Sequence, residues 1–286
     1  MTLAFVLVAA RFVHFLALSI LLGAALFPFY GLAKPAGDVY QRLMWLRPLL
    51  IGSAVLTLAS GLSWLALTLP DVDFAWVWLF RLVLATGVML LTLGKRAGGG
   101  RLRGVVLGSL VLLSSIALTG NAGNNEGETA VQHRLADAIH LVASGVWIGA
   151  LVVFSRLLTM PVRPDRGEYL QAVHDGLERF SGVGTVVVAI LTLSGMINPG
   201  FFLSSLDSAY GQLLLAKLVV FVMMLGLAGA NRFWLTPRLS TTLRSGSQLQ
   251  TAIWALRTSI LLETALGVLV MAMVAWLGVL PPPAFE

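Results

Sequence analysis

The chain has 286 residues, of which 58% are hydrophobic and 11% charged, with a mean hydropathy of +0.89. A soluble domain carries about 25% charged residues, so this composition excludes a soluble, disordered, collagen-like or coiled-coil protein. The chain contains no cysteine, which excludes disulfides and thiolate metal sites. The net charge is +6. The excess of basic residues falls in a few short loops, so we expect no nucleic-acid partner.

Eight apolar segments are long enough to cross a hydrocarbon core about 30 Å thick. They cover roughly residues 3–30, 47–69, 74–94, 103–120, 134–158, 180–204, 209–235 and 252–280. Between the fifth and sixth spans, residues 165–180 follow a pattern typical of an amphipathic helix on the inner leaflet, with His174 on its solvated face. The predicted fold class is therefore all-α, a polytopic membrane protein embedded in the lipid bilayer.

Lysine and arginine are concentrated in alternate connections. The connections after the first, third, fifth and seventh spans contain most of the 19 basic residues, whereas the other three contain none. The positive-inside rule therefore places the basic loops in the cytoplasm and both chain termini outside.

An internal repeat relates the two halves of the chain. The stretch around His14 aligns with the stretch around His140, and Ser60-Gly61 aligns with Ser194-Gly195. Each half contains four spans, so both halves begin on the same side, and a pseudo-twofold axis along the membrane normal should relate them. Residues near this axis meet their equivalents, which makes His14 and His140 a candidate pair. The predicted domains are residues 1–125 and 126–286.

Ionisable residues inside spans are energetically costly and are treated as candidates for function. His14 and His140 should lie roughly 16 and 10 Å below the outer surface. Other polar residues in the spans or at their outer ends form a predicted supporting network: Arg11, Arg81, His133, Asp137, Lys217 and Glu263. Arg11 and Asp137 each precede a histidine by three residues, and we expect them to pair across the axis.

Methionine supplies the soft thioether donor that, with imidazole, suits Cu(I). The predicted copper site is His14 and His140, completed by one or more of three thioethers at similar depth: Met196, Met271 and Met273. Two alternatives remain open. The same histidines would also suit the axial ligands of haem b in a b-type cytochrome, or they hold helices together in a structural scaffold. Nucleotide-binding and hydrolase motifs are absent from the sequence, so no enzyme is predicted.

Residues 137–151 contain Asp137, His140, Ala143, Trp147 and Gly149 at the spacing Asp-x-x-His-x-x-Ala-x-x-x-Trp-x-Gly. This stretch resembles the CopD family of copper-resistance membrane proteins, and the likeness is strongest from residue 133 to residue 283. Later stretches agree with it: residues 210–217, Asn231-Arg232, and the last span through Glu263.

The resemblance implies copper handling across a bacterial inner membrane, with uptake toward the cytoplasm and a periplasmic copper-binding protein as partner. Both termini would then be periplasmic, and the oligomeric state, a homo-oligomer included, stays open. One motif differs, because Gly120-Asn121-Ala122 stands where many relatives have Gly-His-Ala.

Overall fold

The computed structural model describes residues 2–31, 45–68, 75–94, 99–119, 128–160, 166–196 and 208–280. Nearly all of these residues are helical and none lies in a strand, and eight helices among them are long and apolar enough to cross a membrane. The predicted all-α, polytopic fold is thus confirmed. Gly120-Asn121-Ala122 lies outside the described residues.

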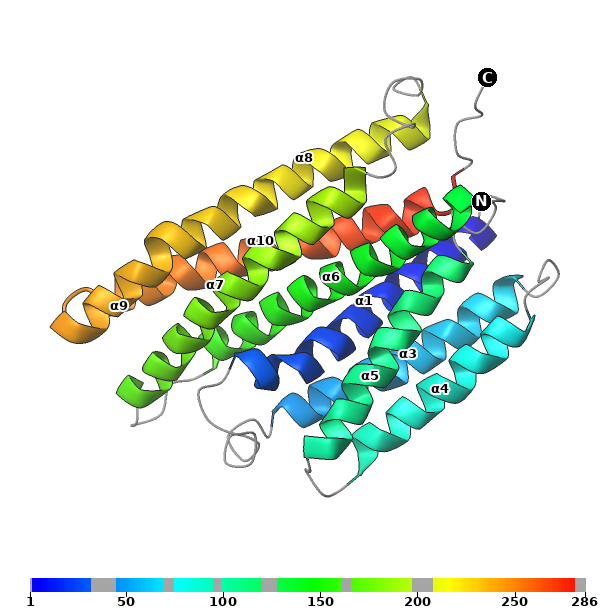
Figure 1. Ribbon diagram of the computed structural model, residues 1–286. Helices are drawn as coiled ribbons and strands as arrows, with labels where there is room; N and C mark the ends of the chain where they lie inside the picture. Colours follow the sequence, from blue (N-terminus) through cyan, green and yellow to red (C-terminus); the bar gives the residue numbers. More distant parts are fainter. Residues whose placement is uncertain are drawn as a thin grey trace.

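The first half of the bundle consists of α1 (Thr2–Tyr30), α3 (Leu46–Thr68), α4 (Ala75–Leu93) and α5 (Gly99–Ser115), which continues into the short 3-10 turn η2 (Ile116–Leu118). The second half consists of α6 (Glu128–Thr159), α7 (Arg166–Met196), α8 (Ala209–Ala230) and α10 (Leu249–Leu277). Figure 1 shows these helices side by side in one bundle, with α1 and α6 in its middle. Helix α1 packs against α3, α5, α6 and α10.

The middle of the bundle depends on small residues where α1 meets α6. Gly23 and Gly149 face each other so closely that a methyl group on Gly23 would lie 2.6 Å from the Gly149 Cα atom. One turn earlier, a methyl group on Gly145 would lie 3.6 Å from the Ser19 Cα atom. Each helix thus carries two small residues four positions apart, which lets the two backbones approach closely. Each facing pair has the same sequence separation as His14 and His140.

The described parts of the predicted amphipathic segment (165–180) and of the predicted sixth span (180–204) form one helix, α7, which runs without interruption from Arg166 to Met196. Three apolar residues of that segment are buried: Leu170, Val173 and Leu177. Helix α7 packs against α6 and α9, so these side chains are covered by protein. His174 is only 4% exposed, and the prediction of a solvated histidine is wrong.

The seventh span is also longer than predicted. Helix α8 continues through a π-helical turn, η5 (Asn231–Leu235), into α9 (Thr236–Ser245). Pro237 lies in the first turn of α9, where a missing backbone N–H costs little. Gly246, with a φ of 69°, ends α9 in the left-handed conformation that glycine adopts easily.

Candidate metal centre

His14 lies in α1 and is held by α3. Its Nδ1 atom lies 3.1 Å from the Thr57 carbonyl oxygen and 3.2 Å from Ser60 Oγ, and the residue is 6% exposed. A carbonyl oxygen can only accept, so Nδ1 carries the hydrogen and donates it. In the neutral imidazole this tautomer leaves the lone pair of Nε2 available to a metal ion.

His140 lies in α6 and is held in the same way by α7. Its Nδ1 atom is 2.9 Å from Ser194 Oγ, and the Leu191 carbonyl is a further acceptor. Ser194 donates its own hydrogen to the Ile190 carbonyl at 2.6 Å, so its oxygen accepts from Nδ1–H. Here too Nε2 is the nitrogen left for a metal.

The two histidine positions share further features. Ser60 and Ser194 each donate to the carbonyl oxygen four residues earlier on their own helix. Each serine is followed by a glycine against which the imidazole lies. A methyl group on Gly61 would be 3.2 Å from His14 Cε1, and one on Gly195 would be 3.8 Å from His140 Cε1. The structure therefore contains the same His–Ser–Gly arrangement in each half.

The histidines face away from the contact between α1 and α6. His14 precedes Gly23 by nine residues, as His140 precedes Gly149. Nine residues make two and a half turns of an α-helix, so each histidine lies on the opposite side of its helix from the glycine. Each imidazole consequently contacts the second helix of its own half. The two histidines therefore occupy two separate, equivalent positions and do not face each other.

Aromatic rings and arginines surround the position of His14. Trp64 meets the imidazole edge-on, with ring centroids 5.7 Å apart, and the Arg11 guanidinium carbon lies 4.8 Å from the Trp64 ring centroid. Arg81 lies over Trp78 and donates to Ser115 and to Thr119. The Arg81 charge also acts on His14. Cation–π contacts thus hold both arginines.

Charged residues of both signs surround the position of His140. The charge of Lys217 on α8 acts on His140, and that of Asp137 acts on Lys217 and on Tyr210. His133 lies half-buried two turns before His140 on α6. Arg11, which we expect to pair with Asp137, stacks on Trp64 and extends to Gly278 at the end of α10. Its pairing with Asp137 stays a prediction.

The three candidate methionines differ in their environments. Met271 is buried in α10, and Met273 is half-buried in the same helix. Met196 is the last residue of α7, two residues after Ser194, and is 64% exposed. Helix α10, which carries Met271 and Met273, packs against both α1 and α6.

Glu263 forms a separate polar cluster that was only partly anticipated from sequence. It is 2% exposed and accepts from Trp147 Nε1 at 2.9 Å and from Asn231 Nδ2 at 2.7 Å. Asn231 begins the π-helical turn, a feature frequent at functional sites. The three residues border a cavity of about 300 Å³. The sequence did not indicate the roles of Trp147 and Asn231, whereas the aligned Ser-Gly pairs already pointed to the two serines.

Replacing either serine should weaken the histidine anchor. We expect Ser60→Ala and Ser194→Ala each to lower the free energy of unfolding by about 1 kcal/mol, because a buried Nδ1–H loses an acceptor. Denaturant unfolding in detergent micelles measures this. A double-mutant cycle of Ser194→Ala with His140→Ala should give a coupling energy of similar size. Thr192→Ala is the control, since that exposed hydroxyl bonds only within its own helix. Equal coupling in both cycles would contradict the anchor.

Comparison with known proteins identifies the family. The protein-family model described as copper resistance protein D matches residues 175–277. A second family model, the copper resistance protein D-like N-terminal domain, matches residues 1–72. Copper resistance protein D of Pseudomonas syringae pv. tomato is 34% identical, over 96% of this chain and 96% of its own length. The inner membrane protein YebZ of Escherichia coli K12 is 29% identical, over 98% of this chain and 99% of its own.

A third relative, the copper transport protein CutJ of Bacillus subtilis, is 35% identical over 54% of this chain and 28% of its own length. No solved structure matches the chain. The matches to the two family models lie at opposite ends of the sequence, and the Pseudomonas relative spans nearly all of it. The chain therefore belongs to the copper resistance protein D family, whose members handle copper in resistance and transport.

Proposed function

We propose that this protein carries copper across the bacterial inner membrane, and that His14 and His140 bind the ion in the outer half of the bundle. The observation that carries the proposal is the anchoring of both imidazoles through Nδ1, which leaves the same nitrogen, Nε2, available to a metal ion in each half. Histidine ligands of metals are commonly oriented in this way through their other nitrogen.

Copper in this proposal binds as Cu(I), for which imidazole and thioether are suitable donors. One imidazole leaves such an ion incompletely coordinated, so methionine completes each position. Helix α10, which carries Met271 and Met273, packs against both helices that carry the histidines, and Met196 lies close in sequence to the serine that anchors His140. Helix α10 is therefore the element best placed to serve both halves.

The neighbouring charges favour a transport position over a storage site. A positive charge acts on each histidine, from Arg81 in the first half and from Lys217 in the second. These charges repel a bound cation and so limit how tightly it is held. Transport requires binding that is strong enough for entry and weak enough for release. The charge of Asp137 partly offsets that of Lys217.

Copper content of purified protein tests this proposal. The wild type should bind Cu(I), His14→Ala and His140→Ala should each lose part of it, and the double variant should lose it all. Met271→Leu and Met273→Leu should lower the affinity, whereas Met223→Leu, which removes an exposed thioether of α8, should not.

A visible absorbance spectrum of the same samples decides between copper and haem. The anchored tautomer also suits an axial haem ligand, which is the specific observation in favour of a b-type cytochrome. Full copper content in both histidine variants, or haem without copper in the wild type, would overturn the proposed copper positions.

We also propose that both termini face the periplasm, where a copper-binding protein loads the carrier. The basic loops support this orientation. A single cysteine placed at Asn125 in this cysteine-free chain should react with an impermeant maleimide added outside intact cells whose outer membrane is permeabilised. A cysteine at Gly99 should react only after the inner membrane is opened. Labelling of both positions from the same side would refute the orientation.

A further inference from the structure

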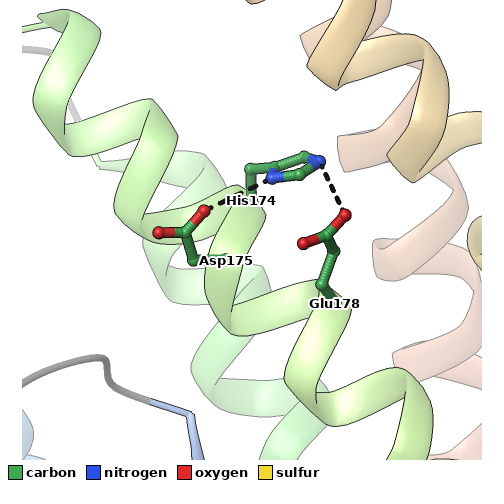
Figure 2. A group of neighbouring side chains, drawn as sticks. All are labelled: His174, Asp175 and Glu178. Atoms are coloured by element: carbon green, nitrogen blue, oxygen red, sulfur yellow. Dashed lines mark hydrogen bonds and ion pairs between the residues drawn. The ribbon is translucent and has the colours of Figure 1, made fainter.

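Three side chains of α7 cluster far from the histidine positions described above. His174, Asp175 and Glu178 each offer a ligand atom, and these atoms lie within 4.8 Å of one another. Figure 2 shows the imidazole with one carboxylate beside each nitrogen. Ser194, which anchors His140, is twenty residues further along the helix, about 30 Å away. The cluster therefore belongs to the opposite end of the bundle.

The imidazole of His174 is buried while its acidic neighbours are accessible. The His174 side chain is 5% exposed, compared with 37% for Asp175 and 65% for Glu178. Its Nε2 atom has no hydrogen-bond partner among the described residues. Burying a polar atom without a hydrogen-bond partner costs free energy, so the buried Nε2 atom requires an explanation.

The geometry around the ring matches a metal-binding histidine. Nδ1 lies 3.5 Å from Asp175 Oδ1, and Gln171 Nε2 donates to the same carboxylate oxygen at 2.8 Å. Asp175 thus orients the ring from the Nδ1 side, an arrangement common around metal-ligating histidines. On the other side, Nε2 lies 3.7 Å from Glu178 Oε1. A cation about 2.1 Å from each of these atoms would fit that separation.

We propose that His174 and Glu178 bind a divalent transition cation, such as Zn²⁺ or Cu²⁺, with Asp175 as the residue that positions the imidazole. The donor set is nitrogen and oxygen, which suits a borderline divalent ion better than Cu(I). The two carboxylates supply the negative charge that such an ion needs. Because Glu178 is exposed, water can complete the coordination. This site goes beyond the proposed copper path and shares no ligand with it.

Zinc binding to the purified full-length protein tests the site. The wild type, stripped of metal with a chelator, should bind Zn²⁺ in equilibrium dialysis. Glu178→Gln should weaken that binding by at least about tenfold and Asp175→Asn by about 10- to 100-fold. His174→Gln should remove one equivalent of zinc. Glu168→Gln is the matched control, because Glu168 lies ten residues before Glu178 on the same helix, about 15 Å along its axis.

Two outcomes would overturn the site. Either no zinc binds to the wild type, or Glu178→Gln and His174→Gln bind it as the wild type does. The side chain of Glu178 is mostly exposed, so this variant is informative even if His174→Gln fails to fold. Copper content at His14 and His140 should be unchanged in the Glu178 variant, so failure here is distinguishable from failure of the proposed copper path.

Discussion

The close contact between α1 and α6 determines the rest of the structure. Inside a bilayer, helices gain no hydrophobic free energy from associating, so they rely on backbones that approach closely and pack well. Gly23 against Gly149, and Ser19 beside Gly145, provide that approach. The facing residues also occupy equivalent places in the two aligned halves of the sequence. Helices α3 and α5 pack on one side of α1, and α7 and α10 pack against α6.

This contact also decides where the histidines point. The glycines take the inner faces of α1 and α6, so His14 and His140, two and a half turns away, must face outward to α3 and α7. The outcome is two positions with the same hydrogen bonds and different charges. Arginines stacked on tryptophans surround the first, whereas Lys217 and Asp137 influence the second.

Much of the fold could be predicted from sequence, because span length and hydropathy are properties of the chain alone. The repeat also placed His14, His140 and the Ser-Gly pairs in correspondence. The sequence could not show which neighbour, lipid or protein, covers a given side of a helix. The pattern of Leu170, Val173 and Leu177 indicates an apolar stripe, but not whether lipid or protein covers it, and so His174 was misplaced. Likewise, charge alone could not show that the Arg11 guanidinium lies over the aromatic face of Trp64.

The most direct test of this account is a cross-link between Ser19 and Gly145. The chain has no native cysteine, so Ser19→Cys with Gly145→Cys can form only one intramolecular disulfide. The backbones there lie within the range that a disulfide spans. Mild oxidation in native membranes should therefore link the pair within each chain, detected by mass spectrometry. Ser19→Cys with Gly226→Cys should stay reduced, because Gly226 lies on the peripheral helix α8. Absence of the first cross-link, or equal formation of both, would contradict the account.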